Sequence, residues 1–186
     1  MDDLTFLKKN AEAEKLSKEL GFARTIFLED IAFLGEENKK TLLKKIQQAK
    51  QQKKIVIFKP ASEEMLRFVL EKTPAEMVLG AETIHPKDSL HYLRAGVDQV
   101  LCKIARDTNK TLAFSFADIL HASEPPKMMA RMMFTIKLCQ KYKVKMFFSN
   151  FSSSLEEMRS APDLFSFWRM LGGKKKEELC YSGKVY

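Results

Sequence analysis

The chain has 186 residues, the length of one ordinary domain, so we expect a single domain over residues 1–186. Hydrophobic residues make up 45% and charged residues 30% of the sequence, which excludes an intrinsically disordered chain. The 7 glycines and 6 prolines are too few for a collagen-like or turn-dense all-β protein. The apolar runs are too short to span a bilayer, and residues 1–9 lack the apolar core of a signal peptide, so we expect a cytoplasmic protein.

The charge of the chain is strongly basic. Lysine and arginine number 32 against 24 acidic residues, a formal net charge of +8, which favours polyanionic partners such as nucleic acid or anionic lipid. The three cysteines, Cys102, Cys139 and Cys180, are far apart and form no CxxC pair. This spacing disfavours a disulfide framework or a zinc ribbon, and reduced thiols in the core are expected instead.

In chain order, short apolar β-rich runs alternate with amphipathic helical stretches. The expected strands are Leu4–Leu7, Thr25–Leu28, Ile55–Phe58, Met77–Leu79, Thr111–Phe116 and Lys145–Phe148. The expected helices are Glu12–Leu20, Lys39–Lys53, one that begins at the capping residue Ser62, Val97–Arg106, Lys127–Lys141 and Asp163–Leu171. Regular alternation implies parallel strands joined by right-handed crossovers, in either a barrel or a doubly wound sheet.

Motifs for several common activities are absent from the sequence. Neither of the phosphate-binding patterns GxGxxG and GxxxxGK[ST] occurs, nor does the nucleophile-elbow pattern GxSxG. His85, Asp88 and His91 lie close together in the sequence, and with Asp118 they could form the metal site of a phosphoesterase, which is one alternative function. This ligand set is smaller than such a site usually needs, so a polar loop is favoured, and we expect neither catalytic residues nor metal ligands.

Two stretches have compositions typical of contact surfaces. Residues 39–54 carry several lysines and no acidic residue, which favours a solvated outer helix over a helix that follows RNA phosphates. The stretch Lys127–Phe134 is rich in methionine. Methionines at i, i+4 commonly fill a core, and the alternative is a surface for a protein partner. A protein–protein scaffold is therefore a further alternative function.

The second half of the chain resembles a known family in the order and spacing of short motifs. These motifs are Gly96–Lys103, Ala113–Phe116, Ala130–Met132, Lys137–Val144 and Arg159–Leu164, followed by Leu171–Gly172. Over residues 94–172 they are similar to protein component 3 of archaeal ribonuclease P, the homologue of a eukaryotic RNase P/MRP protein subunit.

The resemblance implies a TIM-barrel-like α/β fold related to the polymerase/histidinol phosphatase superfamily, without its metal ligands. It also implies a subunit of ribonuclease P, the endonuclease that removes 5′ leaders from precursor tRNA. In that family the RNA is catalytic and uses magnesium, so this chain would bind no cofactor itself. The implied partners are the ribonuclease P RNA, precursor tRNA within the holoenzyme, ribonuclease P protein component 2 and the other protein subunits, with no membrane involved.

The resemblance also indicates residues for RNA contact. Lys103 matches the lysine after the Gly-(Ile/Val)-Asp-x-Val-Leu run, Arg131 lies in the arginine-containing helix, and Lys141 opens the Lys-Tyr-Lys segment. Arg159 precedes the Pro-Asp segment, and Arg94 lies in the loop before the first motif. These five cations are the expected RNA-binding residues.

Two departures from the family pattern bear on the fold. Residues Ser149–Ser152 read Ser-Asn-Phe-Ser, where the family commonly has Ser-Ser-Ala or Ser-Gly-Ala. The stretch between Leu79 and Gly96 is also short by about one strand–helix unit. We therefore expect about six or seven strands and an irregular closure in place of a complete eight-stranded barrel.

Overall fold

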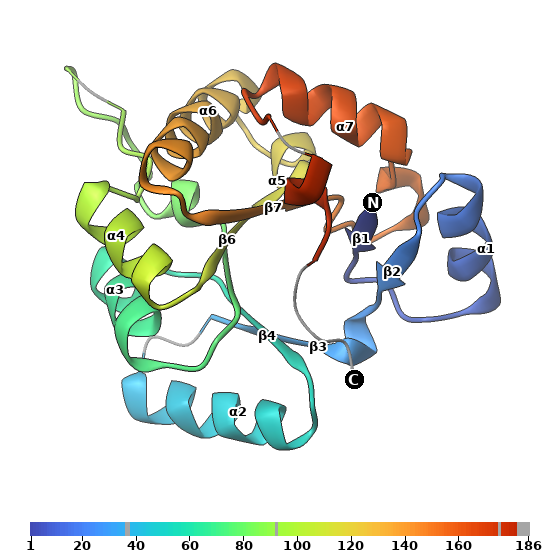
Figure 1. Cartoon of the computed structure of the whole chain (residues 1–186), viewed down its shortest axis with the longest axis horizontal. Helices are drawn as coiled ribbons and strands as arrows, with labels where there is room; N and C mark the ends of the chain where they lie inside the picture. The colour runs from blue at the N-terminus through green and yellow to red at the C-terminus, as the bar shows by residue number, and fades with distance from the viewer. Residues whose placement is uncertain (36–37, 92, 175, 182–186) are drawn as a thin grey trace.

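A computed structural model of the chain describes residues 1–35, 38–91, 93–174 and 176–181 (Figure 1). Its strands form a five-stranded sheet in the order β3-β4-β5-β6-β7 and a two-stranded sheet of β1 and β2. The strands are β1 (Asp2–Leu4), β2 (Arg24–Ile26), β3 (Ile31–Leu34), β4 (Ile55–Phe58), β5 (Met77–Leu79), β6 (Thr111–Ser115) and β7 (Lys145–Ser149). All of these pairs are parallel, as the alternation of strands and helices predicts.

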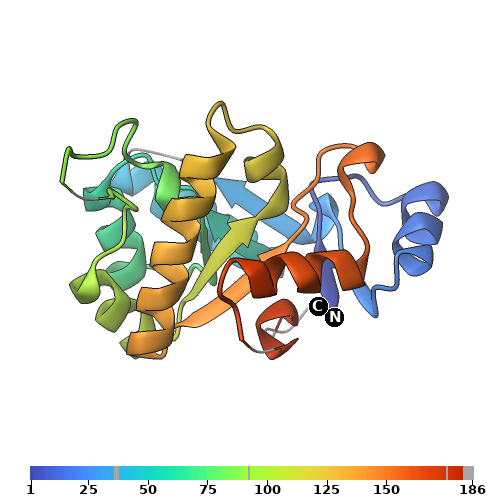
Figure 2. The ribbon, with the colours of Figure 1, turned by 90° about the horizontal axis from the view of Figure 1, so that it is seen from above.

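Helices are arranged around the strands (Figures 1 and 2). They are α1 (Ala11–Glu19), α2 (Lys39–Gln51), α3 (Glu63–Lys72), α4 (Gln99–Asp107), α5 (Phe116–Leu120), α6 (Pro125–Tyr142) and α7 (Ala161–Met170), with 3-10 turns η1 (Leu28–Asp30), η2 (Ala81–Thr83), η3 (Leu155–Glu157) and η4 (Lys176–Leu179). Side chains cap several of them. Ser62 Oγ accepts the Met65 N–H at 3.2 Å, which confirms the expected cap of α3, and Asp98 Oδ1 accepts the Leu101 N–H at 2.8 Å. Such caps satisfy first-turn N–H groups that have no partner within the helix.

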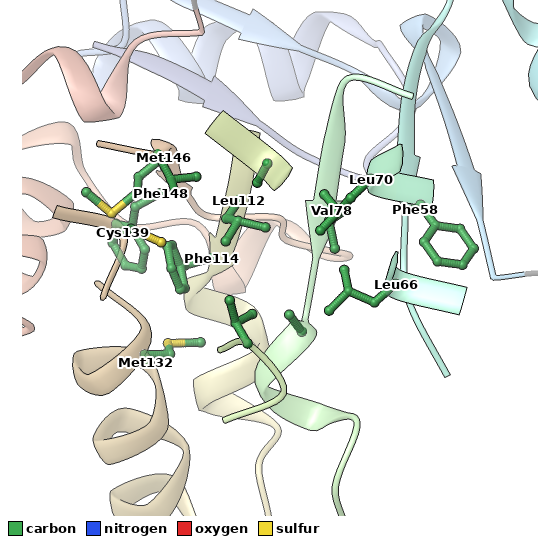
Figure 3. Packing of buried hydrophobic residues seen from close by; sticks show 14 of the residues in the cluster. Phe58, Leu66, Leu70, Val78, Leu112, Phe114, Met132, Cys139, Met146 and Phe148 are labelled. Atoms are coloured by element: carbon green, nitrogen blue, oxygen red, sulfur yellow. The ribbon is translucent and has the colours of Figure 1, made fainter. Parts of the chain in front are cut away.

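Apolar side chains pack on both faces of the five-stranded sheet. Toward the helices, Phe58, Val78 and Phe114 of the strands belong to one buried cluster with Leu66 of α3 and Met132 of α6 (Figure 3). A second buried cluster takes residues from each described strand: Leu4, Ile26, Ile31, Ile55, Ile57, Met77, Leu79, Ala113 and Phe147, together with Phe151 and Tyr181. Strands that are buried on both faces need apolar residues on both, which explains the continuous apolar runs in the sequence.

β1 and β7 belong to different sheets and contact each other through side chains as well as through the backbone. The Leu4 N–H donates to Ser149 Oγ at 2.7 Å, and the Ser149 hydroxyl donates to Asp3 Oδ1 at 2.5 Å. Just beyond β7, the Phe151 N–H donates to the Leu4 carbonyl at 2.8 Å. The segment Ser149–Ser152, which departs from the family pattern, therefore joins the two sheets at this edge.

The expected strands and helices occur in the expected order, although the first strand is Asp2–Leu4 and not Leu4–Leu7, and the structure contains one strand and one helix that the sequence does not predict. β3 follows β2 after only the 3-10 turn η1, so no helical pattern separates the two strands in the sequence. α5 lies directly after β6, where the apolar run predicts one longer strand. Ser115 both ends β6 and caps α5, because its Oγ accepts the Asp118 N–H at 2.9 Å.

The cysteines agree in part with the expected reduced core thiols. Cys102 and Cys139 are buried free thiols, whereas Cys180 is exposed. In the part of the chain that the structure describes, there is also no helix with the length and hydropathy needed to cross a membrane.

Candidate nucleic-acid interface

A groove of about 460 Å³ lies between α4, α6 and the loop that joins β5 to α4. The two helices pack against each other (Figure 1). Phe134, Leu138 and Tyr142 line the groove from α6, at a spacing that places side chains on one face of a helix. Arg94 and Lys141 line it as well. The groove therefore combines an apolar helix face with cationic side chains.

Lys103 of α4 and Lys141 of α6 converge on one aromatic ring. Their Nζ atoms lie 5.9 and 5.5 Å from the centroid of the Tyr142 ring. The negative face of an aromatic ring attracts such cations by about 0.5–1 kcal/mol at exposed sites. The Tyr142 hydroxyl donates to Gln99 Oε1 at 3.1 Å, which ties the end of α6 to the start of α4. Together with Arg94, three of the five expected RNA-binding cations thus lie at or beside this groove.

Arg131, another of the expected RNA-binding residues, has a buried side chain, with 5% of the residue exposed. Its Nε and Nη2 donate to Asp88 Oδ1 at 2.9 and 2.7 Å. Its Nη1 donates to the carbonyl oxygens of Glu82 and His85 at 3.0 and 2.7 Å. The same Asp88 oxygen accepts the Arg94 N–H at 2.8 Å. Hydrogen bonds from Arg131 and then from the Arg94 backbone hold the pKa of Asp88 below its usual value. Arg131 therefore positions the loop that carries Arg94.

Gly96 allows this loop to pass close to η2. Its φ is +73°, in the left-handed region, and a Cβ at this position would lie 1.9 Å from the Ala81 carbonyl oxygen. Only glycine fits such a contact without moving the backbone. This close approach explains why the Gly96–Lys103 motif begins with glycine.

Arg159 lies apart from the groove, in the segment between η3 and α7. Its Nη1 donates to the carbonyl oxygens of Glu156 and Met158 at 2.9 and 3.0 Å. Its guanidinium carbon lies 5.6 Å from the centroid of the Phe116 ring. These contacts hold the side chain against its own turn, and Arg159 is not among the described residues that line the groove.

Two charged residues that the sequence analysis does not single out, Lys59 and Glu82, follow the carboxyl ends of β4 and β5. Glu82 is 1% exposed, and neither oxygen of its carboxyl group has a hydrogen-bond partner among the described residues. Burial, with a smaller contribution from the nearby Asp118 carboxylate, raises the pKa of Glu82 to about 7. Burial also raises the pKa of Asp118, whose Oδ1 lies 3.9 Å from Lys59 Nζ. Ligand sites in α/β folds lie at strand carboxyl ends, so the position of Glu82 just after β5 is the signal that could have identified it.

The residues of the metal-site alternative do not converge in the structure. His85 Nε2 lies 2.6 Å from Glu63 Oε1, and Asp88 is held by the arginine of α6. The backbone N–H of His91 donates to Ser89 Oγ, while Asp118 is paired with a lysine. Within the described ranges, no group of three or more His, Cys, Asp and Glu residues could hold a metal ion.

The lysine-rich and methionine-rich stretches both pack as helices on the core. α2 buries Leu42, Ile46 and Ala49 and exposes most of its lysines, as expected of an outer helix. Met132 of α6 is fully buried, and this agrees with its expected role as core filler. Its neighbour Met133 is 45% exposed, so part of the methionine-rich stretch lies on the surface.

Comparison with known proteins yields a match in fold. No family model matches the sequence, and no curated protein matches it. Among solved structures, the chain is similar to a chain in a cryo-EM structure of archaeal ribonuclease P with mature tRNA. The TM-score is 0.77 and the sequences are 16% identical, over 93% of this chain and 83% of that chain. The two chains share a fold.

Two further structures are less similar. Crystal structures of an uncharacterised protein and of an amidohydrolase both have a TM-score of 0.47 and 8% sequence identity. They cover 74% and 86% of this chain, and the matched parts are 36% and 41% of those chains. The match to the chain in the ribonuclease P structure is thus both closer and more complete.

Proposed function

We propose that this chain is a protein subunit of ribonuclease P that corresponds to protein component 3 of the archaeal enzyme. In this role it binds RNA and supports the catalytic RNA as that RNA removes 5′ leaders from precursor tRNA. The chain contributes no catalytic residue and binds no cofactor, since the magnesium ions serve the RNA. Its partners are the ribonuclease P RNA, precursor tRNA within the holoenzyme, protein component 2 and the other protein subunits, and it works in the cytoplasm.

The observation that carries this proposal is the shared fold with a chain of an archaeal ribonuclease P structure, which extends over 93% of this chain. The order of motifs over residues 94–172 supports the same family independently of the fold, and the net charge of +8 suits an RNA-binding subunit. We further propose that the strands form a TIM-barrel-like arrangement. The buried cluster that draws on each described strand supports this, because inward-facing residues of successive strands fill the interior of a small barrel.

The RNA contacts are proposed at Arg94, Lys103 and Lys141, with Arg159 as a contact on a separate part of the surface. The three groove cations are exposed, so phosphates can reach them without a rearrangement of the core. Each phosphate that they neutralise releases counterions, which strengthens binding at low salt. Arg131 acts indirectly, through the loop that it holds.

An omission assay on reconstituted ribonuclease P tests the proposal. The catalytic RNA and the remaining protein subunits are assayed on precursor tRNA with and without this chain, over a range of magnesium and salt concentrations. We expect cleavage at the 5′ junction to fall sharply when the chain is omitted. Unchanged cleavage under all conditions would refute the role in ribonuclease P and leave the likeness as one of fold alone.

A matched pair of variants tests the RNA contacts. Lys103→Ala/Lys141→Ala removes two cations beside the groove, and Lys40→Ala/Lys44→Ala removes two exposed cations from α2. We expect the first pair to lower the slope of log affinity against log salt by about 1.5, since each phosphate contact contributes roughly 0.7–0.9. The Lys40→Ala/Lys44→Ala variant should change this slope less. Equal effects of the two pairs would mean that RNA responds only to the overall charge.

A further inference from the structure

Large apolar side chains line both walls of the groove between α4 and α6. Phe134 on α6 is 41% exposed, and Leu93 on the opposite loop is 39% exposed. Apolar side chains exposed in a concave surface mark a place where a ligand covers them. The volume of about 460 Å³ lies within the range of roughly 300–1,000 Å³ typical of sites for single small ligands. The groove therefore suits a ligand unit with one flat apolar face.

The cations at or beside the groove outnumber the acidic residues among its described lining. Arg94, Lys103 and Lys141 lie at or beside it. Of the two acidic residues among its lining, Glu63 is paired with the His85 ring, and Asp98 caps the first turn of α4. The groove therefore favours an anionic ligand, and the anion should lie beside the flat face that covers the apolar wall.

We propose that this groove binds one unpaired nucleotide of RNA, with the base against the Phe134 face of α6 and a neighbouring phosphate at Arg94, Lys103 and Lys141. Duplex RNA presents phosphates and ribose hydroxyls outward but keeps its base faces stacked, so it would leave the apolar wall uncovered. An unpaired nucleotide offers a base face and a phosphate together. The inference rests on the proposed function for the source of the RNA, and it deepens that function by naming the form of RNA that this site takes.

Binding of two probes to the full chain tests the proposal. A fluorescently labelled oligouridylate and a labelled RNA duplex of equal total charge are titrated with the protein at one salt concentration, and anisotropy is measured. We expect the single strand to bind about tenfold more tightly, because base–aromatic contacts add to the phosphate term that both probes share. Equal or tighter binding of the duplex would overturn the proposal.

Two variants on one helix provide a matched control. Phe134→Ala removes the ring from the groove, whereas Met133→Ala removes a side chain of similar exposure, 45% against 41%, that is not among the residues lining the groove. Both residues are partly exposed, so both variants should fold, and thermal melting checks this. We expect only Phe134→Ala to remove the preference for the single strand. Equal losses in the two variants would overturn the assignment.

The binding experiments and the omission assay test different claims, so each can fail without the other. If the chain is required for cleavage but shows no preference for unpaired RNA, the nucleotide site is wrong and the proposed function stands. If the preference and its loss in Phe134→Ala are found while omission has no effect, the site stands and the ribonuclease P role fails. Binding of an acidic peptide in the groove without RNA binding would assign it to a protein partner and overturn the proposal.

Discussion

Replacement of Glu82 by glutamine should stabilise the folded protein at alkaline pH and have little effect at acidic pH. In the folded state, burial raises the pKa of Glu82 from its ordinary value of 4.5 to about 7. The folded protein therefore retains a proton that the unfolded chain releases, and stability falls as pH rises from about 4.5 to about 7. Each pKa unit corresponds to about 1.4 kcal/mol, so ionisation of this buried group costs about 3 kcal/mol above neutral pH. Glutamine has nearly the same shape and never ionises.

Urea unfolding of the wild type and of Glu82→Gln at about pH 5 and about pH 8 measures this penalty. We expect the free energies of unfolding to differ by less than about 1 kcal/mol at the lower pH, because in the folded state both side chains are then neutral and of similar size. At the higher pH the variant should be more stable by about 3 kcal/mol. The nearby Asp118 carboxylate contributes to the raised pKa of Glu82, so part of the difference between the two proteins is the relief of repulsion between these two carboxylates. Parallel stability curves for the two proteins would refute the reasoning.

Three further substitutions test the contacts that shape the fold and the groove. Asp88→Ala should destabilise the protein by roughly 3 kcal/mol, because it leaves the buried Arg131 charge without its carboxylate, whereas Asp88→Asn, which keeps an oxygen acceptor, should cost less; an Asp88→Ala variant as stable as the wild type in urea unfolding would contradict the ion pair. Ser149→Ala removes the acceptor of the Leu4 N–H and should cost about 1–3 kcal/mol, and a change within error would mean that this edge does not depend on the hydroxyl. Gly96→Ala should lower stability by more than about 2 kcal/mol, since its Cβ would meet the Ala81 carbonyl; an unchanged melting temperature would contradict that close approach.

At the candidate interface, motif order predicts two of the cations but not how they are arranged in space. Lys103 and Lys141 were selected by their positions in two motifs, and the structure brings both to one tyrosine ring. Nothing in the sequence indicated Tyr142 as their meeting point, because a tyrosine at the end of an amphipathic helix is ordinary. The shared ring appears only when α4 and α6 pack together.

Arg131 shows the opposite case: its residue type and position suggest an RNA contact at the surface, and the structure buries its side chain. Lys127 and Arg131 are one turn apart on α6, a pattern that is typical of an exposed polar face. In the structure, the loop after β5 folds over this part of the helix and supplies Asp88 and two carbonyl oxygens to the guanidinium. A buried arginine with satisfied donors cannot be distinguished from a surface arginine by local pattern.

The amino-acid sequence by itself determined the succession of the six strands and six helices that it predicts, because helix caps, such as Ser62, and the apolar runs of strands depend on neighbouring residues. It also indicated parallel strands, since strands and helices alternate regularly along the chain. The tertiary structure alone decided that β3 follows β2 without a helix and that Ser149 joins β7 to β1. It alone placed Arg131 inside and buried the carboxyl group of Glu82 where no described residue offers it a hydrogen bond. These features depend on residues far apart in the chain, such as the 43 positions between Asp88 and Arg131, and only the packed fold brings such residues together.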